Sequence, residues 1–157
     1  MIDQDTRADL LDAFLTASRA LVGVAVRSIA TASVPITVSQ HRALVLLASG
    51  GANNVAALRE RLGVNQSNVS RLVERLERMG LVIRQRSLTD ARTVDIALSR
   101  RGRAVLDEVT RQRRTEITEV LDAMNEQDRA QAVQAMCAFD AAAREVMDAA
   151  WPLDDDA

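Results

Sequence analysis

The sequence is poor in the residues that metal centres and disulfide scaffolds require. Its 157 residues include one cysteine, Cys137, and one histidine, His41. A single cysteine excludes an internal disulfide framework and fits a reducing cytosol. These two residues lie 96 positions apart and the carboxylates form no tight cluster, so no metal-ligand set is recognisable. We therefore expect neither a metal site nor a cofactor.

Signatures of catalysis and of membrane insertion are also missing. The sequence has no glycine-rich phosphate loop and no nucleophile paired with a base. We therefore predict that the protein is not an enzyme and has no catalytic residue. No apolar run approaches the roughly 20 residues that a bilayer requires, and the N-terminus is acidic and polar, unlike a targeting segment. These absences predict a soluble, cytoplasmic protein without a membrane partner.

Lysine is absent too, so all 20 basic residues are arginine, and they are unevenly distributed. The formal net charge is −2, and residues 1–58 are neutral overall. Residues 59–114 carry 14 arginines against seven acids, a net charge of +7, whereas residues 115–157 carry two arginines against 11 acids. A basic middle segment is typical of phosphate binding, although a block of charge can also simply solvate a surface.

The N-terminal segment from Ile2 to about Thr31 has the apolar spacing of one long helix. Two apolar stripes run along it side by side, the first formed by Leu10, Phe14, Leu21, Ala25 and Ile29 and the second by Leu11, Leu15, Val22 and Val26. Two stripes imply burial on two sides, which one small domain seldom supplies. The pattern therefore favours a partner helix from a second subunit.

Three shorter helices are predicted next. Thr37-Val-Ser-Gln40 is a capping box that opens a helix ending at Gly50-Gly51. A short helix follows over Val55–Leu62, and Gly63 closes it in a left-handed conformation. Asn65 caps the next helix, which runs to Met79. Two helices joined by so tight a turn are typical of a helix-turn-helix.

A hairpin and two more helices complete the predicted elements. Leu81–Gln85 and Thr93–Leu98 have strand composition and flank a turn. The last helices are expected over about Arg100–Met124 and Glu126–Ala150.

The predicted fold is mainly α with a small β-hairpin wing, and we expect one structural domain overall. Residues 1–34 form an N-terminal dimerisation helix, and residues 35–99 form a winged helix-turn-helix lobe. Residues 100–150 form C-terminal dimerisation helices, and the acidic tail at 151–157 is expected to be disordered.

The Asn65–Met79 helix suits a major groove. Its buried face follows i, i+3, i+4, i+7 through Val69, Leu72, Val73 and Leu76. Opposite that face lie small polar and basic side chains, which allow close approach to base edges. The candidate DNA contacts on this helix are Gln66, Ser67, Asn68, Ser70, Arg71 and Arg75. Amides can pair adenine edges and arginine can fork onto guanine, although an ordinary amphipathic surface helix shares part of this pattern.

The hairpin adds further candidate contacts: Arg84 and Arg86 on its first strand, and Asp90 and Arg92 in the Ser87–Arg92 loop. This part of the chain resembles the multiple antibiotic resistance regulator (MarR) family of winged-helix transcription factors. The resemblance is carried by the run from Val69 to Val82 (VSRLVERLERMGLV), by Asp90-Ala-Arg92, by Val94-Asp-Ile-Ala-Leu-Ser99 and by Gly102. The resemblance covers nearly the whole chain. It implies that Asp90 orients the wing and that Arg92 reaches a phosphate or the minor groove. It also implies a homodimer built from the first and the last two helices.

The resemblance implies a sequence-specific double-stranded-DNA-binding regulator, most often a repressor that a small aromatic or lipophilic anion releases. Dimer symmetry predicts a pseudo-palindromic operator with half-sites about one turn apart. The implied effector pocket lies between the dimer helices and the DNA-binding lobe, near Ile29, His41 and Val45. Two alternatives stay open, a winged-helix module for protein contacts without an effector and a constitutive DNA binder.

The lone histidine and the lone cysteine each have two readings. His41 is either a structural or surface residue, or a contact for an effector or a pH switch. Cys137, between Met136 and Ala138, is expected to be a buried small side chain rather than an oxidation sensor.

Overall fold

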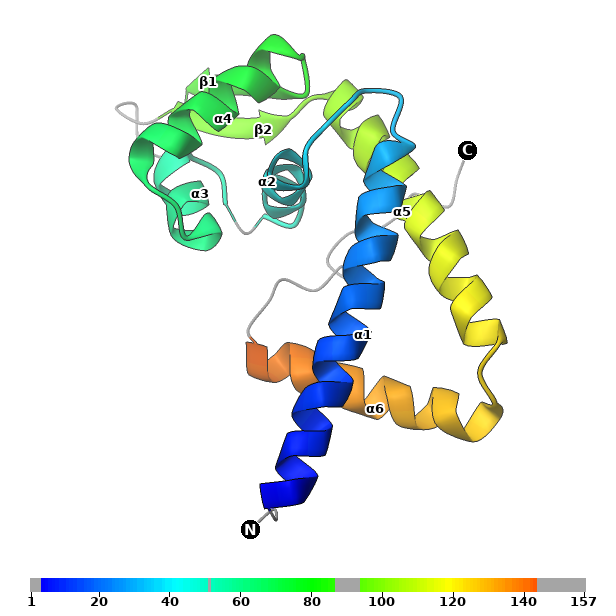
Figure 1. Ribbon diagram of the computed structural model, residues 1–157. Coiled ribbons are helices and arrows are strands. Elements are labelled where there is room, and N and C mark those ends of the chain that lie inside the picture. The colour runs from blue at the N-terminus through cyan, green and yellow to red at the C-terminus, as the bar shows by residue number, and fades with distance from the viewer. Residues whose placement is uncertain (1–3, 51, 87–93, 144–157) are drawn as a thin grey trace.

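The computed structural model describes residues 4–50, 52–86 and 94–143, and these form six helices and one two-stranded antiparallel sheet (Figure 1). The elements are α1 (Gln4–Ala30), α2 (Val38–Ala48), α3 (Val55–Leu62), α4 (Gln66–Arg78), β1 (Val82–Arg86), β2 (Val94–Leu98), α5 (Arg100–Asp122) and α6 (Glu126–Ala143). The hairpin pairs Val82 with Leu98 at one end and Arg86 with Val94 at the other. The predicted fold, mainly helical with a small hairpin, is confirmed.

Short-range capping bonds set where the helices of the winged lobe begin. Thr37 and Gln40 form the predicted capping box at α2, in which each side chain accepts a hydrogen bond from the other's backbone. Asn54 caps α3, and the Oδ1 atom of Asn65 accepts from the Asn68 amide at 2.9 Å to open α4. Gly63 ends α3 with a φ of 65°, a conformation that is unfavourable for residues with a Cβ atom and open to glycine.

The core of the winged lobe lies between α2, α3, α4, the sheet and the start of α5. The predicted inner face of α4 is confirmed, since Val69, Val73 and Leu76 are fully buried and Leu72 packs partly buried against the same core. The Ile96 amide donates to the Asn53 carbonyl at 2.6 Å. This bond ties the α2–α3 connection to β2 and holds α3 against the hairpin.

The start of α5 is fastened to the turn between α4 and β1 by a group of four residues, Gly80, Leu81, Ser99 and Gly102, which we term the α5 clasp. The Ser99 hydroxyl donates to the Gly80 carbonyl at 2.6 Å and accepts from the Gly102 amide at 2.9 Å, while the Ser99 amide donates to the Leu81 carbonyl at 3.1 Å. A Cβ atom at Gly102 would overlap the Leu81 carbonyl oxygen and lie 2.9 Å from its carbon. Only glycine permits so close an approach.

Outside this lobe, the C-terminal half of α1 packs against the first part of α5 and the two helices then diverge, while α6 crosses the N-terminal half of α1 (Figure 1). The rings of Phe14 and Phe139 stack at this crossing with their centroids 4.8 Å apart. Much of the apolar surface of these helices is exposed: Leu10, Leu11, Leu15, Leu21, Val22 and Val26 on α1, Val120 and Leu121 on α5, and Val133, Met136 and Phe139 on α6. We call this set the apolar arm surface.

Two sequence-based expectations about these helices were wrong. Thr6–Ala30 is long and apolar enough, by length and composition, to cross a membrane, although no such run was expected. Five charged residues interrupt that stretch in the sequence (Arg7, Asp9, Asp12, Arg19 and Arg27), yet its mean hydropathy still reaches 1.4. Cys137 was expected to be buried but is exposed, because α6 buries none of its described residues within the single chain.

Replacing Gly102 by alanine should lower the free energy of unfolding by about 3 kcal/mol, because the new methyl group must push α5 away from Leu81. Urea denaturation measures this change. Ala104→Gly is the matched control, since Ala104 is exposed two positions further along the same helix and its replacement should cost about 1 kcal/mol through helix propensity alone. A Gly102→Ala protein as stable as the wild type would contradict the close contact in the α5 clasp.

Candidate nucleic-acid interface

The outer surface of α4 carries the six helix residues predicted to contact DNA. Gln66, Ser67, Asn68, Arg71 and Arg75 are exposed, and Ser70 is half-buried. The Ser67 hydroxyl donates to Asn65 Oδ1 at 2.9 Å, so the cap also orients a side chain at the tip of the helix. The surface therefore presents short polar groups at its first turn and guanidinium groups behind them.

A shallow hollow lies where α4 meets the start of α2. Its volume is about 240 Å³, and its lining consists of Thr37, Gln40, Asn68, Arg71, Leu72 and Arg75. Neither Arg71 nor Arg75 forms an ion pair with any described residue. Two cations without a counterion among the described residues, next to the amide of Asn68, form a surface complementary to a phosphodiester and an adjacent base edge.

Gln40 holds the two walls of this hollow together. Its side chain is buried, its Oε1 accepts from the Thr37 amide at 2.8 Å, and its Nε2 donates to Met79 Sδ at 3.7 Å. The sequence revealed the capping box but not the contact with Met79, because that contact joins residues 39 positions apart. Gln40 is therefore both a cap for α2 and a spacer between α2 and α4.

On the opposite flank of α4 lies β1, with Arg84 and Arg86 exposed along it. Arg84 Nε lies 3.0 Å from Glu77 Oε2, so this wing arginine is paired with a carboxylate of α4. Asp90 and Arg92 fall outside the described residues, and their predicted roles stay predictions. The structure thus brings eight of the ten predicted contact residues onto α4 and the neighbouring strand.

The residues predicted to line an effector pocket lie on α1 and α2. Ile29 and His41 are buried, with 6% and 7% of their surface exposed, and Val45 is half-buried one turn after His41 on α2. Burial, together with the positive charge of Arg113 on α5, lowers the pKa of His41 from 6.5 to about 4. His41 is therefore a neutral interior residue, which excludes the surface reading.

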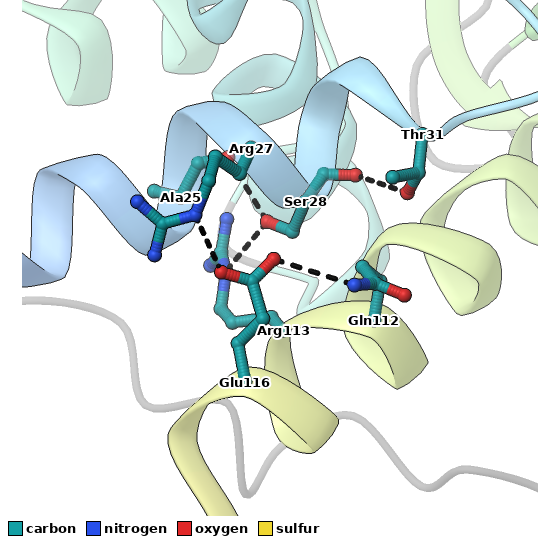
Figure 2. A network of polar contacts seen from close by, with 7 residues as sticks. All are labelled: Ala25, Arg27, Ser28, Thr31, Gln112, Arg113 and Glu116. Atoms are coloured by element: carbon teal, nitrogen blue, oxygen red, sulfur yellow. Dashed lines mark hydrogen bonds and ion pairs between the residues drawn. The ribbon is translucent and has the colours of Figure 1, made fainter. Parts of the chain in front are cut away.

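A polar network joins α1 to α5 (Figure 2), and it includes Arg113, whose charge acts on His41. Arg113 Nε donates to Ser28 Oγ at 3.5 Å, and Ser28 is fully buried. Glu116 accepts from Arg27 Nε at 2.8 Å and from Gln112 Nε2 at 3.3 Å. Sequence reasoning missed Arg113, because nothing in its local spacing indicates that it approaches a histidine 72 positions earlier in the chain. Among the described residues, no group of three histidine, cysteine or acidic side chains could hold a metal ion.

Comparisons with known proteins give this geometry a context. Residues 36–94 match the model of the MarR family. The uncharacterized HTH-type transcriptional regulator Mb0904 of Mycobacterium bovis is 31% identical over 131 residues, which cover 82% of this chain and 87% of that protein. The crystal structure of RV1404 from Mycobacterium tuberculosis superposes with a TM-score of 0.82 at 39% identity, covering 92% of this chain and 99% of the other. FabT of Streptococcus pneumoniae, solved in complex with DNA, shares the fold with a TM-score of 0.68 at 20% identity, over 84% of this chain and 94% of that one.

The free energy of unfolding should fall as the pH drops from about 7 toward 4. The unfolded chain binds a proton at an ordinary histidine near pH 6.5, whereas native His41 binds it only near pH 4, so acid favours the unfolded state. This difference is worth roughly 3 kcal/mol at most. Denaturant titrations at several pH values measure it.

His41→Gln should flatten this dependence between pH 7 and 5, since the chain has no second histidine. Below that range other groups contribute, among them Glu108, whose pKa is lowered by hydrogen bonds from the Ser33 amide and hydroxyl. An equal slope in the two proteins between pH 7 and 5 would show that His41 is not the group responsible.

Proposed function

This chain belongs to the MarR family of winged-helix, DNA-binding transcriptional regulators, and on that premise we propose that it is a cytoplasmic repressor that binds a pseudo-palindromic operator as a homodimer. The observation that carries the proposal is the outer surface of α4. It combines an exposed polar first turn with two arginines that no described carboxylate neutralises. A surface of this kind is complementary to a major groove.

The proposed interface divides into base-reading and phosphate-binding parts. Gln66 and Asn68 pair adenine edges, and Arg71 forks onto guanine. Arg75, which lines the hollow beside α2, binds the phosphate backbone. On the wing, Arg86 and Arg92 reach flanking phosphates while Asp90 orients the loop. Base contacts then choose the sequence, and arginine–phosphate contacts supply affinity that depends on salt.

The apolar arm surface is the proposed dimer interface. It spans α1, α5 and α6, and a single soluble chain rarely leaves so many large apolar side chains exposed on three neighbouring helices. A two-fold dimer built on these helices would place two α4 helices about one DNA turn apart, roughly 34–36 Å. The same pairing would cover the stretch of α1 that is apolar enough to cross a membrane.

An effector would bind where α1, α2 and α5 meet, next to Ile29, His41 and Val45. Arg113 is half-buried there, and its described partner is a hydroxyl at 3.5 Å. A guanidinium with so weak a neutral partner suits the carboxylate of a small aromatic anion. Release of operator DNA on titration with aromatic carboxylates would support this role, whereas unchanged DNA affinity would favour a constitutive binder.

Two arginines should differ in what they contribute to DNA binding. Arg92→Ala should weaken binding to every sequence and reduce the slope of log K against log salt by about 0.9, as expected for one lost phosphate contact. Arg71→Ala should instead relax base preference at one position of each half-site. Duplexes selected from a random pool, followed by salt titrations, measure both effects.

Arg129→Ala is the matched control, because Arg129 is exposed on α6 in the acidic part of the chain. It should leave affinity, slope and preference unchanged. If wild-type binding were weak and insensitive to salt, the winged helix would instead be a module for protein contacts. An Arg92→Ala protein with wild-type affinity throughout the titration would show that the wing does not contact DNA.

Leu15→Glu should convert the dimer to a monomer, because it places a charge in the apolar stripe of α1. Sedimentation equilibrium measures the mass. Ile83→Glu is the control, since Ile83 is an exposed apolar residue on β1, away from the arm surface. Equal masses for wild type and Leu15→Glu would contradict the proposed interface.

A further inference from the structure

The ion pair between Glu77 and Arg84 connects the recognition helix to the wing. Glu77 lies in the last turn of α4, and Arg84 is the central residue of β1, paired with Ile96 of β2. Arg84 Nε lies 3.0 Å from Glu77 Oε2, and the side chains of Arg84 and Glu77 are 38% and 43% exposed, respectively. The pair therefore bridges two elements whose relative position decides where the wing lies beside DNA.

This pairing distinguishes Arg84 from the arginines on the other flank of α4. Arg71 and Arg75 line the hollow beside α2 and have no ion pair with a described residue. Glu77 cancels the charge of Arg84, so Arg84 adds little to the positive potential that attracts phosphate. To bind a phosphate, Arg84 would have to leave Glu77, whose free carboxylate would then repel the same DNA backbone.

We propose that Glu77 is a positioning residue that holds Arg84 against α4, so that Arg84 fixes the wing to the recognition helix instead of contacting a phosphate. The proposal rests on the proposed DNA-binding function, and it removes Arg84 from the contacts predicted from sequence. It also implies that Glu77 lowers the affinity of the protein for DNA of any sequence. Removing its charge releases one additional arginine toward any duplex.

The test in DNA is a set of salt titrations with a duplex of random sequence. Arg84→Ala should leave the salt slope unchanged, because Arg84 contacts no phosphate. Its affinity should fall several-fold, because the freed Glu77 carboxylate repels the DNA backbone and the wing is no longer held against α4. Glu77→Gln should bind several-fold more tightly with a slope steeper by about 0.9, and Arg84→Ala in that background should abolish the increase in slope. In a Glu74→Gln background, Arg84→Ala should again leave the slope unchanged, because Glu74 is an exposed acid of the same helix that forms no described ion pair with Arg84.

The test without DNA is amide hydrogen exchange in β1. Glu77→Gln and Arg84→Ala should each accelerate exchange of the β1 amides several-fold, whereas Glu74→Gln should not. A wild-type slope reduced by about 0.9 on Arg84→Ala alone would make Arg84 a phosphate contact and overturn the proposal. Unchanged exchange in Glu77→Gln would overturn it as well. Failure of the wild type to bind any duplex would instead refute the proposed function, while exchange would still decide the positioning role.

Discussion

The close approach of α5 to the Leu81 carbonyl is the constraint on which the rest of the structure depends. It fixes the turn that follows α4, and through that turn it sets the direction in which the recognition helix leaves the core. Ser99 supplies the hydrogen bonds on one side, and the missing side chain of Gly102 permits the contact on the other. Because α5 also packs along α1, one helix connects the polar network at Arg113 with the end of α4. The polar network and the end of α4 are therefore both in contact with the same helix.

Charge is distributed across the molecule in a way that matches its architecture. The basic middle segment of the sequence contributes α4, the hairpin and the first part of α5, whereas the acidic C-terminal segment contributes α6. Within the basic lobe the two flanks of α4 differ, since arginines beside α2 lack described counterions and Arg84 on the wing side has Glu77. The near-neutral total thus conceals a positive surface, part of which is neutralised by a neighbouring carboxylate.

Features encoded over a few adjacent residues could be predicted from the sequence, whereas contacts between distant residues could not. The spacing of Val69 and Val73 gave the buried face of α4, and Asn65 gave its start. The proximity of Arg113 to His41 depends on how α1, α2 and α5 pack, which no local pattern reveals. The exposure of Cys137 was missed for a related reason, since the apolar spacing of α6 indicates that a face will be covered but not by which chain. The proposed DNA contacts rest on side-chain chemistry, which the sequence displays without the fold.

The burial of His41 has a consequence for how the molecule can be observed. The chain has no second imidazole and no tyrosine, so the ring protons of His41 appear in a sparse aromatic spectrum, to which only two phenylalanines and one tryptophan also contribute. They belong to a ring at the meeting point of α1, α2 and α5, and they stay in one protonation state across the physiological range. A change in their chemical shift at neutral pH would thus report altered packing around the ring, caused by helix movement or by a bound molecule, rather than a titration. This residue is therefore a spectroscopic probe of the joint between the arm helices and the winged lobe.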